Sequence, residues 1–205
     1  GRLAAALDAL APDGLVEIVP TFRSLLVEFD PDVTSEDALL AALPDTAGAG
    51  EAAAPAAAWR VPVAMDGAHA EDLAEAAERL GLAPDRLREV FLAGTYQLGM
   101  YGFAPGFSYL SGVDPALAIP RRASPRPPMA AGSVLIAGGM AALSPQAMPT
   151  GWYVIGRTPA PLFSPERSPM VPFAVGDTIR FRRIDGDTCD RLAASEDGGL
   201  AREDP

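Results

Sequence analysis

The chain has 205 residues, 49% of them apolar, and can therefore bury one sizeable core or two small ones. Its formal net charge is −11, and so acidic a protein is a poor candidate for binding nucleic acid. No apolar run approaches the roughly 20 residues that a membrane span requires, so we expect no membrane partner.

The beginning of the chain predicts a helix, two strands and a second helix. Leucines at helical spacing indicate the first helix over residues 2–11. Residues 15–19 and 24–29 are typical of the two strands of a hairpin. Thr34-Ser35-Glu36-Asp37 has the form of a capping box at the start of the second helix. This order makes up most of a ferredoxin-like α+β unit.

A linker and a domain boundary follow. Residues 45–58 are mainly alanine, glycine and proline without hydrophobic patterning, so we predict that the first domain and its linker span residues 1–55. The next segment predicts, in order, one strand and two amphipathic helices: residues 59–65, 70–80 and 84–94.

The remainder of the chain predicts an all-β unit. Helical periodicity ends at Gly99, and glycine- and proline-rich turns separate short β-like runs. These runs are residues 133–137, 152–155 and 178–183. We predict a second domain over residues 56–184, for which composition leaves both a barrel and a sandwich open. Residues 185–205 are polar and acidic, which predicts a disordered or loosely attached tail.

The residue types limit the chemistry of this chain. All 16 basic residues are arginines, which excludes a Schiff-base lysine and a phosphate-loop lysine. His69 and Cys189, each the only residue of its type, are distant in sequence from the glycine- and proline-rich blocks, which disfavours a Ser-His-Asp or Cys-His triad. We interpret His69 as a cap or a solvent-facing residue. One cysteine and one histidine also make a metal-free, cytoplasmic protein the simplest prediction.

Arginines gather in the β-rich half. Residues 91–183 hold eight arginines and only three acids. Arg121, Arg122 and Arg126 lie on a loop that four prolines stiffen, and their paired N–H donors match the edge of a carboxylate or phosphate. We predict that they and Arg157 bind an anion. The alternative is that these arginines only solvate barrel loops.

Glycines, prolines and aromatic residues alternate over residues 99–126, which predicts a shaped surface: either the wall of a binding site or a packed corner. Nearby, the amides of Gly138 and Gly139 could face an oxyanion, and Ser133 and Tyr109 could donate hydrogen bonds. The candidate binding residues of the aromatic stretch are Phe103, Pro105, Gly106, Phe107 and Tyr109.

Five sequence blocks in this half carry a resemblance. They are Gly102-Phe103-Ala104-Pro105-Gly106-Phe107-Ser108-Tyr109-Leu110, Pro120-Arg121-Arg122-Ala123-Ser124-Pro125-Arg126, Ala131-Gly132-Ser133-Val134, Ile136-Ala137-Gly138-Gly139, and Gly151-Trp152 with Ile155-Gly156-Arg157-Thr158-Pro159. Over about residues 15–183 the chain resembles the allophanate hydrolase subunit 1 family. That family includes the KipI-like proteins, the B subunit of 5-oxoprolinase and the matching part, subdomains C and D, of the urea carboxylase carboxyltransferase domain.

The resemblance implies an α+β fold with two parts. The first is a ferredoxin-like domain without its usual first strand, so we expect that the chain is truncated or that its N-terminus is not included. The second is a cyclophilin-like closed barrel packed against two helices. A shared barrel does not carry the activity of cyclophilins with it.

The resemblance also implies an activity. It predicts a subunit of an ATP-dependent amidohydrolase that acts, with a homologous second subunit, on a small carboxylated amide such as 5-oxoproline or allophanate. ATP is implied for the assembled enzyme, and no cofactor is expected to bind tightly in this chain. The hypothesis assigns catalysis to Arg126, Gly138 and Gly139. It assigns substrate binding to Phe103, Pro105, Gly106, Phe107, Tyr109, Arg121, Arg122, Ser133 and Arg157.

Several positions depart from the family pattern and favour a divergent subgroup or a member that binds without catalysing. The departures are at Phe91, Thr95, Met140, Ala141, Ser144 and Thr150, and they remove several polar groups of relatives from the expected pocket rim. The alternative function is that of a KipI-like inhibitor of a sensor histidine kinase, with residues 101–109 as its interface. A carboxyltransferase-type role beside a biotin protein and a vestigial member are further alternatives.

Overall fold

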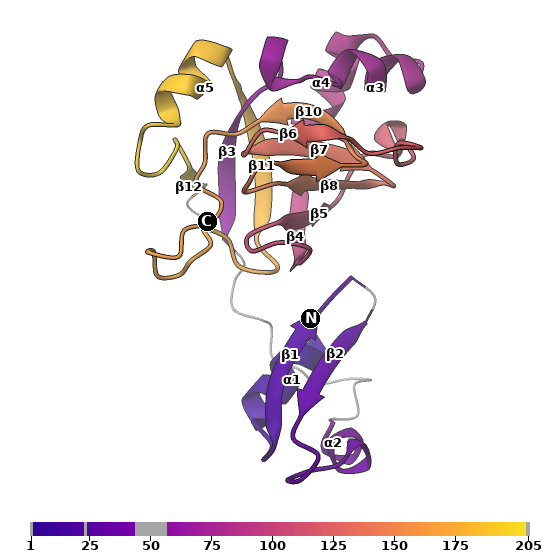
Figure 1. Cartoon of the computed structure of the whole chain (residues 1–205), viewed down its shortest axis with the longest axis vertical. Helices are drawn as coiled ribbons and strands as arrows, with labels where there is room; N and C mark the ends of the chain where they lie inside the picture. The colour runs from indigo at the N-terminus through magenta and orange to yellow at the C-terminus, as the bar shows by residue number, and fades with distance from the viewer. Residues whose placement is uncertain (1, 23, 44–56, 204–205) are drawn as a thin grey trace. The chain divides into compact units, whose positions relative to one another are not determined.

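The computed structural model describes residues 2–22, 24–43 and 57–203. The chain divides into two compact units, Gly1–Ala56 and Ala57–Pro205 (Figure 1). The predicted linker, residues 45–58, lies outside the described residues except for its last two positions. None of the described helices is long and apolar enough to cross a membrane.

The first unit is an antiparallel hairpin with a helix on each side of it in sequence. Its elements are α1 (Arg2–Leu10), β1 (Leu15–Pro20), β2 (Leu25–Phe29) and α2 (Glu36–Ala42). Ser35 caps α2, because its hydroxyl accepts a hydrogen bond of 3.3 Å from the N–H of Ala38. Leu7 of α1 and Leu39 of α2 are buried. The predicted order of helix, strand, strand and helix is confirmed.

The second unit is a closed barrel of seven strands. They are β3 (Ala58–Ala64), β4 (Tyr96–Tyr101), β5 (Ser108–Ser111), β7 (Ser133–Ala137), β8 (Met140–Leu143), β10 (Tyr153–Arg157) and β11 (Thr178–Ile184). Around the barrel the order is β10, β7, β8, β5, β4, β11 and β3, and the pairing of Arg157 with Ala64 joins β10 back to β3. Only β3 and β11 run parallel among these pairs. The predicted α+β fold with a closed barrel is confirmed.

Short elements surround the barrel. They are η1 (Gly67–His69), α3 (Leu73–Arg79), α4 (Pro84–Ala93), η2 (Pro115–Leu117), the ribbon of β6 (Arg126–Met129) with β9 (Met148–Thr150), α5 (Gly186–Leu192) and β12 (Ala201–Glu203). The helices α3, α4 and α5 lie at the same end of the barrel in Figure 1. The two predicted helices therefore exist at the expected positions, and α4 begins at Pro84 as its sequence indicates.

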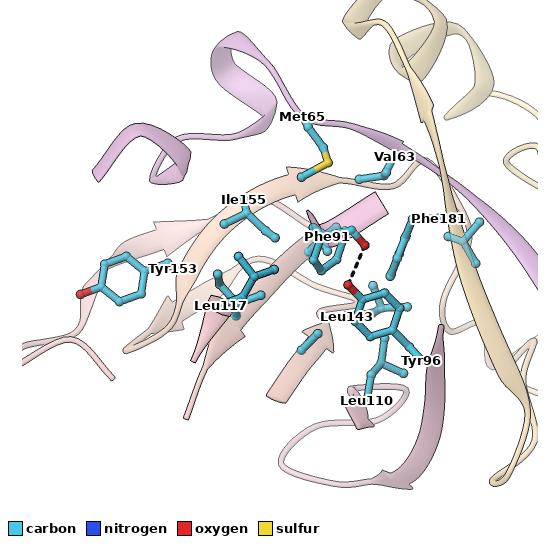
Figure 2. Packing of buried hydrophobic residues seen from close by; sticks show 14 of the residues in the cluster. Val63, Met65, Phe91, Tyr96, Leu110, Leu117, Leu143, Tyr153, Ile155 and Phe181 are labelled. Carbon is cyan, nitrogen blue, oxygen red and sulfur yellow. Dashed lines mark hydrogen bonds between the residues drawn. The ribbon is translucent and has the colours of Figure 1, made fainter. Parts of the chain in front are cut away.

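The barrel interior is filled by apolar side chains and is not a channel (Figure 2). Phe91 of α4 is fully buried, and its ring centroid lies 5.1 Å from that of Tyr96 and 4.9 Å from that of Phe181. The Tyr96 hydroxyl donates a hydrogen bond of 2.7 Å to the carbonyl oxygen of Phe91. Burial raises the pKa of Tyr96 well above its ordinary value. Phe91 is therefore a core residue and not part of a pocket rim, which corrects the expectation for this position.

The prediction of a disordered tail over residues 185–205 is wrong for residues 185–203, and its last two positions lie outside the described residues. Asp185 caps α5 by accepting a hydrogen bond of 2.7 Å from the N–H of Thr188. Cys189 packs in a small apolar cluster with Ala64 of β3. Glu203 of β12 forms ion pairs of 2.7 Å with Arg60 and 2.9 Å with Arg180. Asp185 is thus a helix cap and Glu203 a partner for two barrel arginines, roles that composition does not reveal.

His69 takes part in the attachment of α5. Its Nε2 atom lies 3.0 Å from the Asp190 Oδ1 atom, and only 12% of its side chain is exposed. The interpretation of His69 as a solvent-facing residue is therefore wrong, because its ring lies against the start of α5 near Gly186.

We expect Tyr96→Phe to lower the free energy of unfolding by about 1 kcal/mol, because it removes one buried hydrogen bond and creates almost no cavity. The loss stays this small because the Phe91 oxygen also accepts a hydrogen bond of 3.2 Å from the Gly94 N–H. Tyr153→Phe is the matched control, since the described residues offer its hydroxyl no hydrogen bond. Urea denaturation measures the free energy of unfolding of both variants. Equal losses would contradict a stabilising role for the hydrogen bond between Tyr96 and Phe91.

Candidate functional site

A tight turn between β4 and β5 brings two phenylalanine rings to one place. The Gly102 N–H donates to the Phe107 carbonyl oxygen at 3.2 Å, and the Phe107 N–H donates to the carbonyl oxygen of Ala104 at 3.0 Å. Gly106 has a φ of +77°, and a Cβ atom there would lie 2.6 Å from the Cβ atom of Phe163. This position requires glycine for both its conformation and its close packing.

The turn forms one side of a cavity of about 380 Å³. The cavity is lined by Phe103, Phe107, Tyr109, Arg121, Pro125, Met148, Pro149, Thr150, Gly151 and Trp152. Its aromatic rings touch in series: the centroid distances are 5.5 Å from Phe103 to Phe107, 4.9 Å from Phe107 to Tyr109, and 5.9 Å from Tyr109 to Trp152. The rings pack at tilted or edge-to-face angles, which is a favourable arrangement for aromatic pairs. We call this cavity the aromatic pocket.

Arg121 is the charged residue of the aromatic pocket. Its guanidinium carbon lies 5.6 Å from the centroid of the Trp152 ring, within the range of a cation–π interaction. Among the residues that the structure describes, no carboxylate forms an ion pair with Arg121. Burial raises the pKa of Tyr109, and the positive charge of Arg121 partly offsets that increase. The pocket therefore offers a guanidinium beside aromatic faces, which suits an anion attached to a flat or apolar group.

The other two arginines of the loop are already paired. Arg126 donates to Asp72 at 2.9 Å and to Glu71, while Arg122 forms an ion pair of 2.8 Å with Glu75. Arg79 also pairs with Glu75 at 3.0 Å, so three guanidinium groups meet three carboxylates and the group as a whole carries no excess positive charge. Arg122 and Arg126 are thus engaged by carboxylates of this chain, and neither lines the aromatic pocket, so their predicted role in anion binding stays a prediction.

Asp72 is the centre of this polar group. It is 7% exposed, and its Oδ2 atom accepts hydrogen bonds from Arg126 and, at 2.8 Å, from the N–H of Val154. The Asp72 N–H donates in return to the Val154 carbonyl oxygen at 2.9 Å. A residue at the start of α3 thus holds β10 and β6 together.

The remaining predicted residues lie elsewhere. The Ser133 hydroxyl donates to the Ala130 carbonyl oxygen at 2.7 Å, and the Arg157 Nε atom donates to the carbonyl oxygen of Ala131 at 3.0 Å. Neither residue lines the aromatic pocket, and Pro105 is an exposed residue of the turn. Their predicted role in substrate binding stays a prediction.

Gly138 and Gly139 form the two-residue turn between β7 and β8. Their φ angles are +58° and +75°, as a type I′ hairpin requires. The Gly138 N–H donates to the Ile119 carbonyl oxygen at 2.7 Å, so it is not available to polarise a substrate carbonyl. The assignment of Gly138 to an oxyanion site is therefore wrong in this structure.

Sequence reasoning missed Trp152 and its neighbours. The Arg122 N–H donates to the Gly151 carbonyl oxygen at 2.8 Å, and β6 pairs with β9 through Arg126 and Thr150, so these segments complete the pocket. Gly151-Trp152 is one of the resembling blocks, but the sequence pattern places Trp152 in a predicted strand and so does not indicate that it lines a pocket. Of the positions that depart from the family pattern, Thr150 lines the pocket, whereas Ala141 and Ser144 are fully buried.

Comparisons with known proteins agree on one family. Residues 1–173 match the family model described as carboxyltransferase domain, subdomain C and D. The chain is 41% identical over 124 residues to the B subunit of 5-oxoprolinase from Bacillus subtilis (strain 168), a match that spans 60% of this chain and 52% of that protein. It is 40% identical over 121 residues to the same subunit from Escherichia coli O157:H7, with 59% and 56% covered. The chain thus spans about half the length of the curated relatives it matches.

Solved structures extend the comparison. TTHA0988 superposes with a TM-score of 0.78 at 33% identity, over 90% of this chain and 36% of that one. The conserved uncharacterized protein PH0987 from Pyrococcus horikoshii superposes with a TM-score of 0.61 at 32% identity, over 90% of this chain and 86% of that one. The urea amidolyase of K. lactis superposes with a TM-score of 0.77 at 16% identity, over 98% of this chain and 14% of that one. This likeness shows a shared fold alone.

We expect Asp72→Asn to lower the free energy of unfolding by about 1–3 kcal/mol, because it removes one of the two carboxylates that pair with the largely buried Arg126 and leaves only Glu71. An asparagine amide can replace the oxygen that Val154 requires, but its NH₂ group then faces the guanidinium. Asp85→Asn removes the same charge from an exposed carboxylate that pairs with Arg88 and should cost less than about 1 kcal/mol. Urea denaturation compares the two variants, and a small loss for both would show that Asp72 is not the centre of the group.

Proposed function

Because the chain belongs to the carboxyltransferase domain family, subdomains C and D, we propose that it is a subunit of an enzyme that hydrolyses a C–N bond in a small carboxylated amide. The names of the curated relatives support an enzyme of the 5-oxoprolinase type, and 5-oxoproline is the substrate we propose first. The proposal includes a homologous second subunit, since the relatives are named as subunits of one enzyme.

The observation that carries this proposal is the position of Arg121 in the aromatic pocket. Its guanidinium lies against Trp152 and forms no ion pair with another described residue. A carboxylate can accept two parallel N–H bonds from such a group. The flat lactam ring of 5-oxoproline can then lie along the face formed by Tyr109 and Phe107.

Within this proposal the chain binds and orients the substrate. Hydrolysis adds the oxygen of water to the amide carbon, breaks the C–N bond and transfers a proton to the departing nitrogen. The pocket lining includes no carboxylate, histidine or cysteine that could move this proton. We therefore assign activation of the water to the second subunit. The four aromatic rings of this chain exclude bulk water from one face of the substrate.

The pocket does not fit the triphosphate of ATP. Arg121 is the one cation of the lining, and within residues 2–22, 24–43 and 57–203 no group of three or more acidic, His or Cys side chains could hold a metal ion. A triphosphate normally requires several donors together with Mg²⁺. We therefore place the ATP of the assembled enzyme outside this pocket.

A second candidate function follows from Phe103. This residue is 77% exposed at the edge of the pocket, an arrangement that would also serve a protein interface. This favours the KipI-like hypothesis, in which residues 101–109 bind a sensor histidine kinase. The enzyme hypothesis explains the presence of Arg121 in the pocket better than the KipI-like hypothesis does, because an anion site adds little to a purely apolar interface.

We expect Arg121→Gln to weaken binding of 5-oxoproline by about 10- to 100-fold, because one charge-assisted pair is lost. Isothermal titration calorimetry without ATP, on this chain mixed with the second subunit, measures the dissociation constant. Arg86→Gln is the matched control, since it removes the same charge from an exposed helix position paired with Glu89. Binding that is equal in both variants would contradict the proposed role of Arg121.

A readout without ligand shows whether Arg121 faces the pocket in solution. Since its charge lowers the pKa of Tyr109, Arg121→Gln should raise that pKa further. Ultraviolet titration of the phenol, with Tyr109→Phe identifying its signal, measures the shift. If wild-type complex binds no 5-oxoproline while this shift is present, the geometry stands and the proposed substrate fails. A sensor kinase then becomes the next partner to test.

A further inference from the structure

Phe103 adopts a backbone conformation that its side chain disfavours. Its φ is +70°, and it is the one non-glycine residue with a positive φ within residues 57–203. A bulky residue in this region is strained, whereas glycine is not. The same turn uses glycine at Gly106, where φ is +77°. The strain at Phe103 therefore comes from the identity of the side chain and not from the turn alone.

Packing within the protein does not explain the phenylalanine. The residue is 77% exposed, and among the described residues its one aromatic contact is the edge-on pair with Phe107 at 5.5 Å. A strained residue that is buried can be held by the contacts of its side chain. Phe103 lacks such contacts, so the fold gains little from its ring. A strained and exposed residue at a cavity points to a role in ligand binding.

The place of Phe103 in the aromatic pocket indicates what that role is. The rings of Phe103, Phe107, Tyr109 and Trp152 touch in series, and Arg121 contacts the last of them. Phe103 and Arg121 also line the same cavity of about 380 Å³. A ligand whose carboxylate binds Arg121 and whose flat apolar part fills this cavity would cover the exposed face of Phe103.

We propose that Phe103 is a specificity-determining residue of the aromatic pocket, which favours a carboxylate joined to a flat ring over a carboxylate that lacks one. This inference rests on the proposed function only in that the pocket binds a carboxylated ligand. The gain comes from burying the exposed phenylalanine ring against the ligand. A small carboxylate held at Arg121 does not reach that ring and gains nothing from it.

The test compares benzoate, which has a flat ring, with acetate, which has none. The variants are Phe103→Gly, which removes the ring and relieves the strain, and Phe103→Trp, which keeps an aromatic ring. Calorimetry gives both dissociation constants, and thermal unfolding gives Tm. We expect Phe103→Gly to weaken the binding of benzoate by about tenfold and to change the dissociation constant of acetate by less than about twofold. The substitution should not lower Tm. Phe103→Trp should stay within about threefold of the wild type for benzoate.

Four outcomes overturn the inference. They are benzoate binding in Phe103→Gly within about twofold of the wild type, equal losses of benzoate and acetate, a lowered Tm that accompanies the loss, and a wild type that binds neither acid. The proposed function is judged separately by 5-oxoproline in the mixed subunits. A wild type that selects benzoate through Phe103 but shows no hydrolysis of 5-oxoproline would support this inference and reject that substrate.

Discussion

The buried carboxylate of Asp72 fixes the arrangement on which the site depends. It lies at the start of α3, accepts from the β10 backbone at Val154, and pairs with Arg126 at the beginning of β6. A charge removed from water is tolerated only when its partners satisfy it, and here a guanidinium and a backbone N–H do so. Each partner comes from a different segment, so one side chain sets the relative position of a helix, a barrel strand and the outer ribbon.

The three arginines of the loop, Arg121, Arg122 and Arg126, therefore have different roles. Arg122 and Arg126 are held by the carboxylates of α3 and of the residues just before it, which anchors the loop at both positions. Arg121, one residue before the first anchor, lies over Trp152 instead. A functional side chain on a loop is positioned well only when its neighbours are fixed by other contacts. The paired arginines therefore serve the site by orienting Arg121, although they do not line the pocket.

The sequence predicted local structure better than it predicted partners. Both units, the hairpin, the two helices before the barrel and the aromatic turn follow from periodicity, caps and resemblance. The pairing of Arg126 with Asp72 spans 54 residues, and the acids of α3 look like an ordinary solvated face. Glu203 similarly looks like part of a free acidic tail until β12 pairs with β3. Trp152 was hidden because a tryptophan beside a strand resembles core, and only the fold shows that it meets Arg121.

The closed barrel explains why the site lies on its outer surface. Its interior is packed with side chains such as Phe91 and Tyr96, so it has no room for a ligand. Closure through Arg157 and Ala64 leaves no open edge in the seven-strand ring and makes a rigid support. The turns outside the barrel can vary in conformation, and the turn that carries Phe103 holds this residue at a strained positive φ that packing of the core does not require. The molecule thus separates stability, which resides in the barrel, from recognition, which resides in one strained turn and the anchored loop that faces it.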